Sequence, residues 1–92
     1  MIIREEEQKN QAELLEIKSA TYIGDFAIRV EFNDHHKVLV DFKPFLMKAL
    51  HPGIRKYQEE LLFKQFKIVD GNLNWNDYEM IFPLDDIYKV KI

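Results

Sequence analysis

Two stretches of strict apolar–polar alternation, separated by a short polar turn, constrain this chain more than any other feature. Apolar side chains recur at every second position from Phe26 to Phe32, and again from Val38 to Phe42. A period of two places alternate side chains on opposite faces, which is the pattern of a β-strand with one buried face. The turn NDHH at 33–36 is too short for a crossover, so the two strands must pair antiparallel.

The same alternation extends upstream and predicts a three-stranded meander. Leu15 and Ile17 alternate with charged residues before Gly24-Asp25 interrupts the chain. The expected strands span 14–23, 26–32 and 37–42. Leu39 falls among the outward positions of the third strand, which predicts some cover on the second face of the sheet.

The period then changes from that of a strand to that of a helix. Pro44 predicts the start of a short helix that runs through Leu50, because proline is tolerated in a first helical turn. His51 is interpreted as a C-terminal residue of that helix, favoured there by the helix dipole. A second, amphipathic helix is expected over 54–64, with an apolar stripe formed by Ile54, Tyr57, Leu61 and Leu62.

The strand period returns in the last third of the chain. A hairpin is predicted over 66–75, with a turn at 70–72 whose glycine takes a positive φ. Apolar residues alternate again over 78–82, a single helical turn is expected over 83–88, and 89–92 is expected to form a last short strand. This order predicts the α+β class: a small antiparallel sheet built from a meander, two short helices, a hairpin and a final strand, with the helices packed on the sheet.

Length and composition fit one small domain. The chain has 92 residues, of which 47% are hydrophobic, so it can form a thin core and is too apolar for a disordered chain. Residues 1–13 are mainly polar, and the charged stretch 4–13 carries almost no apolar stripe. They are expected to be a loose N-terminal extension that orders only by packing, for example on a second copy of the chain. The single α+β domain is expected to span 14–92.

The chain contains no cysteine, which excludes a disulfide framework, a cysteine-based zinc site and a thiol nucleophile. Sixteen acids and 13 bases give a net charge of −3, which argues against generic nucleic-acid binding. No secretory leader is visible, and apolar runs such as Phe45-Leu46-Met47 are far shorter than the roughly 20 residues that span a bilayer. A cytoplasmic protein without membrane contact is therefore expected.

Few residues could carry catalysis or bind a metal. His35 and His36 are a candidate metal or acid–base pair, but adjacent residues of an extended segment point to opposite faces, so solvated turn histidines are the favoured interpretation. Asp85 and Asp86 follow Pro83, where acids match the dipole of a first helical turn, and this structural role is favoured over acid–base work. No nucleophile motif and no phosphate-binding glycine loop is present. The chain is therefore predicted not to be an enzyme and to bind no cofactor.

Basic residues around the second expected helix could form a footprint for nucleic acid. Glu59 and Glu60 interrupt them, so a mixed-charge, solvated face is the favoured interpretation, and this chain alone is not expected to bind nucleic acid. The basic residues are Arg55, Lys56, Lys64 and Lys67, with Lys43 and Lys48 as an extension of the patch.

Aromatic residues are the more informative surplus. Seven Phe, four Tyr and one Trp exceed what a thin core must enclose. Alternation places most of the C-terminal aromatic residues in the core, yet any that are exposed would mark a docking surface, because aromatic side chains concentrate at protein interfaces. The candidate interaction surface consists of Trp75, Tyr78, Phe82 and Tyr88.

Four spaced segments between Asp25 and Tyr88 resemble a known family. They are FAIRVEFND, VDFKPFL, LLFKQFKIVDGNLNW and FPLDDIY, in the order and spacing of a small bacterial domain-of-unknown-function family, number twenty-four forty-two. The resemblance implies a small α+β domain, in some members fused to a helix-turn-helix DNA-binding domain. It also implies genes placed beside those of other small proteins, in the manner of toxin–antitoxin pairs. No catalytic residue or ligand follows from it.

We therefore expect a non-catalytic protein-interaction or accessory module that self-associates or works with a separately encoded small protein. Sheet-edge pairing or helix docking would supply the contact. The alternative is a DNA-associated transcriptional or toxin–antitoxin-type regulator. A weaker alternative is a small metal-dependent hydrolase that uses His35, His36 and nearby acids.

Overall fold

The computed structural model describes residues 15–92, and the predicted extension at 1–13 lies outside the described residues. The elements are β1 (Ile17–Gly24), β2 (Ala27–Phe32), β3 (Lys37–Asp41), α2 (Lys43–Lys48), α3 (Pro52–Arg55), the 3₁₀ turn η2 (Lys56–Gln58), α4 (Glu60–Phe63), β4 (Lys67–Val69), β5 (Asn72–Asn74) and α5 (Leu84–Tyr88). Antiparallel strands with several short helices packed around them confirm the predicted α+β class.

The meander forms as the alternation predicts. Strands β1, β2 and β3 make one antiparallel sheet in that order, and Val30 of β2 pairs with Ala20 on one side and Val38 on the other. Alternate apolar side chains share the inner face of this sheet. The side chains that are fully buried there are Ile28, Val30, Phe32 and Val40.

The outer face of the meander is open to solvent, so the cover predicted from Leu39 is absent within residues 15–92. Leu39 is 55% exposed, and its neighbour in register on β2 is Arg29. In the next outward pair, Glu31 lies opposite Lys37. The alternation therefore buries one face only, and Leu39 is an exposed leucine among polar neighbours.

The helix predicted over 54–64 is broken into three pieces. After α3 and η2, Glu59 takes an extended conformation (φ −82°, ψ 115°) before α4 begins. Tyr57 and Phe63 are both buried, whereas a continuous helix would set two residues with this spacing about 120° apart around its axis. The break at Glu59 turns both rings toward one core and leaves Leu61 60% exposed.

His51 begins a helix instead of ending one, which corrects its predicted role. Its Nδ1 accepts a hydrogen bond from the backbone N–H of Gly53 at 3.0 Å, so it is the N-cap of α3. Such a cap satisfies one of the free N–H groups of a first helical turn. Pro52 follows at the first helical position, where its missing N–H removes no helical bond.

The last third of the chain contains the predicted hairpin but not the predicted final strand at 89–92, and the alternation over 78–82 forms no strand either. Strands β4 and β5 pair antiparallel around the turn 70–71, in which Gly71 has a φ of 78°. All three residues at 76–78 have positive φ, so the chain coils in a left-handed turn, and only an isolated bridge joins Trp75 to Met80. No strand forms at 89–92.

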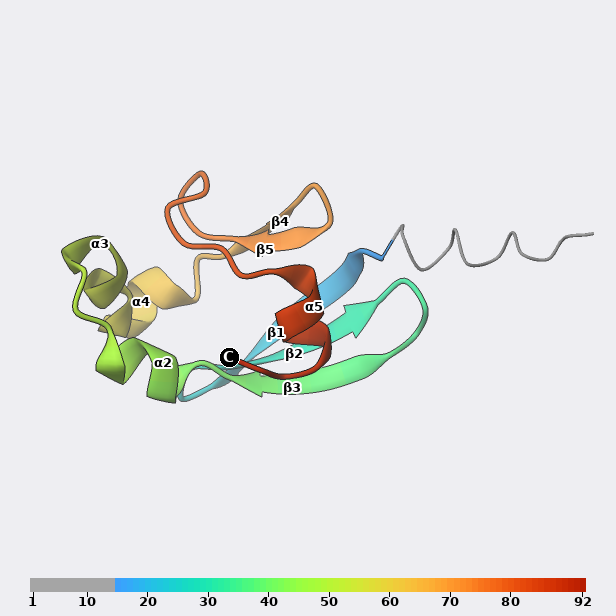
Figure 1. Ribbon diagram of the computed structural model, residues 1–92, viewed down its shortest axis with the longest axis horizontal. Helices are drawn as coiled ribbons and strands as arrows, with labels where there is room; N and C mark the ends of the chain where they lie inside the picture. Colours follow the sequence, from blue (N-terminus) through green and yellow to red (C-terminus); the bar gives the residue numbers. More distant parts are fainter. Residues whose placement is uncertain (1–14) are drawn as a thin grey trace, which may run out of the picture.

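One core lies between the meander, the hairpin and α5. Figure 1 shows the β4–β5 hairpin and α5 lying over the meander, while α2, α3 and α4 gather beyond one end of it. The ring of Trp75 occupies the middle of this core, with centroid distances of 5.5 to 6.0 Å to four phenylalanine rings, those of Phe42, Phe63, Phe66 and Phe82. Among the described residues, no helix combines the length and the apolarity needed to cross a bilayer.

Candidate functional site

The four aromatic residues of the candidate interaction surface do not lie together on the surface. Trp75 and Phe82 are only 1% and 7% exposed, and both belong to the core. Tyr78 is 51% exposed, whereas Tyr88 is half-buried with its ring packed against Phe32 at 4.9 Å. Two of the four side chains are therefore out of a partner's reach in the folded chain, and Tyr78 is the most exposed of the set.

All four tyrosines donate their hydroxyl groups to carboxylates on other elements. Burial, the largest cause at Tyr22 and Tyr57, and these hydrogen bonds, the largest cause at Tyr78 and Tyr88, both disfavour the ionised phenol and raise the pKa of each tyrosine. The pKa of Tyr57 is raised to about 12. Each bond fastens a short element to a neighbour. The pairs are Tyr22 with Glu60 (2.6 Å), Tyr57 with Glu79 (2.7 Å), Tyr78 with Asp70 (2.9 Å) and Tyr88 with Asp34 (2.6 Å).

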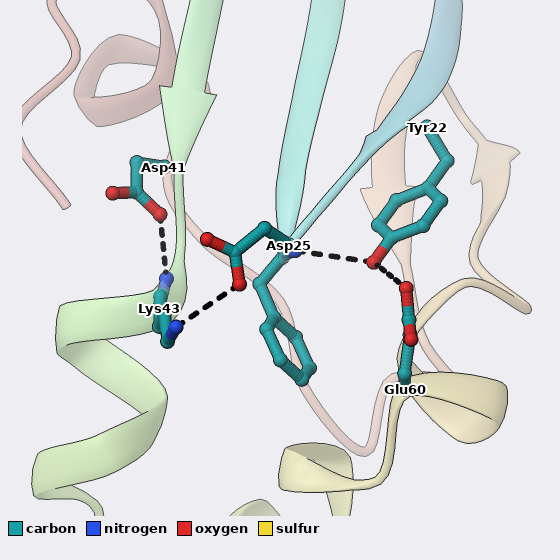
Figure 2. Close-up of polar contacts among 6 residues, drawn as sticks. Tyr22, Asp25, Asp41, Lys43 and Glu60 are labelled. Carbon is teal, nitrogen blue, oxygen red and sulfur yellow. Dashed lines mark hydrogen bonds and ion pairs between the residues drawn. The ribbon is translucent and has the colours of Figure 1, made fainter.

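Figure 2 shows the first of these pairs, where the β1–β2 turn meets the helices. The hydroxyl of Tyr22 accepts a hydrogen bond from the backbone N–H of Phe26 at 3.1 Å and donates to Glu60 at 2.6 Å. In the same turn, Oδ1 of Asp25 lies 3.0 Å from Nζ of Lys43 at the start of α2. This network joins the β1–β2 turn to α2 and α4. We therefore assign these side chains a structural role.

Glu79 is the carboxylate most strongly stabilised in its ionised form. Its Oε1 lies 2.7 Å from Nζ of Lys56, and it accepts hydrogen bonds from the hydroxyl of Tyr57 at 2.7 Å and the amide of Asn76 at 3.0 Å. These contacts, led by the one with Lys56, lower the pKa of Glu79 to about 2. Ionised Glu79 thus joins η2 to the loop that follows β5.

We expect the free energy of unfolding to fall as the pH drops from about 4.5 to about 2, because Glu79 has the lower pKa in the folded chain. Its ionised form stabilises the fold above the ordinary glutamate pKa, and that contribution is lost as the folded chain takes up the proton. Urea unfolding across this pH range measures the effect. Glu79→Gln should flatten the dependence, whereas Glu59→Gln, on an exposed glutamate, should not. Equal pH dependence in wild type and Glu79→Gln would contradict the assignment.

The turn between β2 and β3 sends its two histidines to different neighbours. His36 stacks on the ring of Tyr88, with centroids 4.2 Å apart and planes 24° apart. His35 is exposed, and its Nδ1 lies 3.7 Å from the carboxylate of Glu31. Within residues 15–92, no group of three His, Asp or Glu side chains is placed to hold a metal ion.

The basic residues of the candidate nucleic-acid footprint do not form one unpaired set. Lys56 is held by Glu79 at 2.7 Å, and Lys43 by Asp25 at 3.0 Å. Glu60 of α4 places a negative charge among the other basic residues, and its carboxylate accepts a hydrogen bond from the hydroxyl of Tyr22. Part of the positive charge on this side of the molecule is therefore neutralised within the chain.

A cavity of about 720 Å³ lies between the helical segment and the β4–β5 hairpin. Lys56, Lys67 and Asp77 bring charge to it, and none of the described residues that line it is a serine, threonine, cysteine or histidine. Asn74 on its hairpin side is buried, and its Oδ1 accepts the backbone N–H of Tyr78 at 2.7 Å, which supports the left-handed turn. The lining thus provides packing and turn support, without a nucleophile–base pair.

The free edge of β3 is the feature that most resembles a site. The backbone N–H of Phe42 donates to the carbonyl of Phe26 at 2.9 Å, so the backbone groups of Phe42 are directed toward β2. Successive residues of an antiparallel strand direct their N–H and C=O groups to opposite sides. The groups directed away from β2 belong to Lys37, Leu39 and Asp41, and none of them has a backbone partner within residues 15–92.

The other edge of the meander is partly covered. The backbone N–H of Ile17 donates to the carbonyl of Gly71 at 2.8 Å, so the start of β1 is joined to the hairpin. Register shifts also interrupt β1 on either side of its centre. Strand β3 contains neither a proline nor a register shift, which are common devices against strand addition. A sequence signal for this edge existed in the outward Leu39, set between Lys37 and Asp41.

The comparisons with known proteins identify a family. No curated protein and no solved structure matches the chain. Residues 17–92 match the family described as a protein of unknown function, DUF2442. The match begins at the first residue of β1 and takes in every described strand and helix. It confirms the resemblance predicted from the four spaced segments, and the chain belongs to the DUF2442 family.

Proposed function

We propose that this domain is a non-catalytic protein-interaction module whose contact surface is the free edge of β3. The observation that carries the proposal is the row of backbone groups at Lys37, Leu39 and Asp41 that have no backbone partner among residues 15–92. An extended segment of a partner can add to such an edge as a further strand, with main-chain hydrogen bonds supplying affinity. An exposed edge strand that binds no partner favours aggregation, and proteins commonly protect such edges. We place this contact in the bacterial cytoplasm, a setting compatible with a chain that lacks cysteine.

The two alternative functions have less support among the described residues. A DNA-associated regulator needs an unneutralised basic face, but Lys43 and Lys56 are paired with carboxylates. A metal-dependent hydrolase needs ligands that converge on one point, whereas His35 and His36 have different neighbours. The edge of β3 requires no such rearrangement, because its groups already point outward.

Leu39→Pro should weaken the contact and keep the fold. Proline removes a backbone N–H that has no partner within the described chain, and outward positions of edge strands tolerate proline. Leu39→Thr is the matched control, because threonine keeps the N–H and favours strands.

Tagged full-length chains, expressed in the source cells together with an untagged copy, provide the measurement. A protein, either the untagged copy or another chain, should be retained by wild type and Leu39→Thr. Retention by Leu39→Pro should fall about tenfold, which corresponds to about 1.4 kcal/mol, the order of one net hydrogen bond. Thermal unfolding shows whether the variant is folded. Equal retention of that protein by folded Leu39→Pro, or no retained protein with wild type, refutes the proposed edge.

A further inference from the structure

We infer that the strand occupying this edge is β3 of a second copy of the chain, paired antiparallel about a two-fold axis at Leu39. The inference rests on the proposed function, because it requires the edge of β3 to be the contact surface. The pairing would join two meanders into one continuous antiparallel sheet. An isologous contact of this kind uses the same patch on both copies and closes at the dimer.

The backbone of β3 is self-complementary in this register. With Leu39 opposite its own counterpart, Lys37 lies opposite Asp41 of the second copy, and Asp41 opposite its Lys37. These are the residues whose N–H and C=O groups point away from β2. Every outward residue therefore meets an outward residue, and each such pair can exchange hydrogen bonds in both directions.

The side chains match in the same register. Lys37, Leu39 and Asp41 are all exposed on the outer face of the sheet. The two-fold axis places each lysine directly across from an aspartate, and opposite charges in that position stabilise a strand pair. The two Leu39 side chains, each 55% exposed, would remove apolar surface from water against one another.

Other pairings lose this match. An antiparallel shift by two residues sets Leu39 opposite a charge, and an in-register parallel pairing sets each charge beside its like, which destabilises a strand pair. A shift by one residue sets Leu39 opposite Val38 or Val40, whose backbone groups are directed toward β2 and are not available to the second copy. An edge lysine alone is a device against pairing. Combined with Asp41 at the same distance on the other side of Leu39, Lys37 makes the edge selective for its own sequence.

The contact is short, so the dimer should depend strongly on concentration. Strand β3 has five residues, which is far less than the roughly 20–30 residues that each partner contributes to a standard interface. We expect a monomer–dimer equilibrium that sedimentation velocity resolves between about 10 µM and about 1 mM of the purified full chain.

Charge substitutions at Lys37 and Asp41 test the register. Lys37→Asp and Asp41→Lys each place like charges in both symmetric pairs, so each alone should raise the dissociation constant at least about tenfold. An equimolar mixture of the two variants should associate again, because each supplies the charge that the other lacks. The double variant Lys37→Asp/Asp41→Lys should return to within about threefold of wild type.

The double variant is also the matched control for effects within one chain. Lys37→Asp places an acid opposite Glu31, and Asp41→Lys removes the carboxylate that accepts the backbone N–H of Lys43 at 3.0 Å. The double variant carries both losses. Any recovery of association in the double variant therefore comes from the contact between copies, and thermal unfolding of all three variants shows that each is folded.

The outcomes separate this inference from the proposed function. Association of folded Leu39→Pro and of both single-charge variants at wild-type strength overturns both. Loss of association in Leu39→Pro alone, with both single-charge variants at wild-type strength, overturns the register and leaves the edge as the contact surface. A wild-type chain that stays monomeric to about 1 mM overturns the second copy as the occupant. In that case, capture of another protein that Leu39→Pro weakens still supports the edge.

Discussion

Trp75→Ala is expected to lower the free energy of unfolding by about 3–5 kcal/mol. The side chain is 1% exposed, and its ring lies 5.5 Å from that of Phe63 and 5.8 Å from that of Phe42. Its indole N–H also donates to the carbonyl of Phe63 at 2.7 Å. Small domains have only about 5–15 kcal/mol of stability, so this single truncation removes a large share. Because Trp75 is the only tryptophan, unfolding has to be followed by far-UV circular dichroism.

Two further variants show which part of Trp75 matters. Trp75→Phe keeps an aromatic ring but removes the donor to Phe63, and an unsatisfied buried carbonyl costs about 1–3 kcal/mol. Tyr78→Ala is the surface comparison, because Tyr78 is 51% exposed and its truncation should cost less than about 1 kcal/mol. Equal losses from Trp75→Ala and Tyr78→Ala would contradict the placement of Trp75 in the core.

The meander could be predicted closely because burial of one face selects a single periodicity. The expected strand 26–32 is observed as Ala27–Phe32, with Phe26 in the turn. Tyr78, Met80 and Phe82 also place apolar side chains at every second position, but this stretch makes no strand. Asn and Asp tolerate positive φ better than most residues, and the side chain of Asn74 accepts the N–H of Tyr78, so a left-handed turn competes successfully there.

The sequence could predict a sheet edge as the kind of candidate site, but it could not predict which edge is free. Sheet-edge pairing follows from any small open sheet, whereas the choice of edge depends on what covers the other one. Here the edge of β1 is covered at its start by the hydrogen bond from the N–H of Ile17 to the carbonyl of Gly71, two residues that are far apart in the chain. The bond from Tyr88 to Asp34 spans 54 positions and is equally invisible to local spacing. Contacts of this range appear only once the short elements have been packed.

Phe63→Ala and Leu61→Ala are expected to differ by several kcal/mol, in the order opposite to that of a continuous helix over 54–64. Such a helix places Leu61 in its apolar stripe, but the observed chain leaves Leu61 60% exposed and buries Phe63 completely. Phe63→Ala should therefore cost about 3–5 kcal/mol. Leu61→Ala should cost less than about 1 kcal/mol. Urea unfolding of the two variants measures both losses.

The reason for the difference lies in the length of α4. A helix of four residues has no stability of its own in water, so its position depends on what its side chains contact. The ring of Phe63 lies 5.3 Å from that of Phe26 and 5.5 Å from that of Trp75, and it thus joins the β1–β2 turn to the hairpin. Leu61 has no comparable burial. A larger loss from Leu61→Ala than from Phe63→Ala would mean that the helix runs unbroken through Glu59.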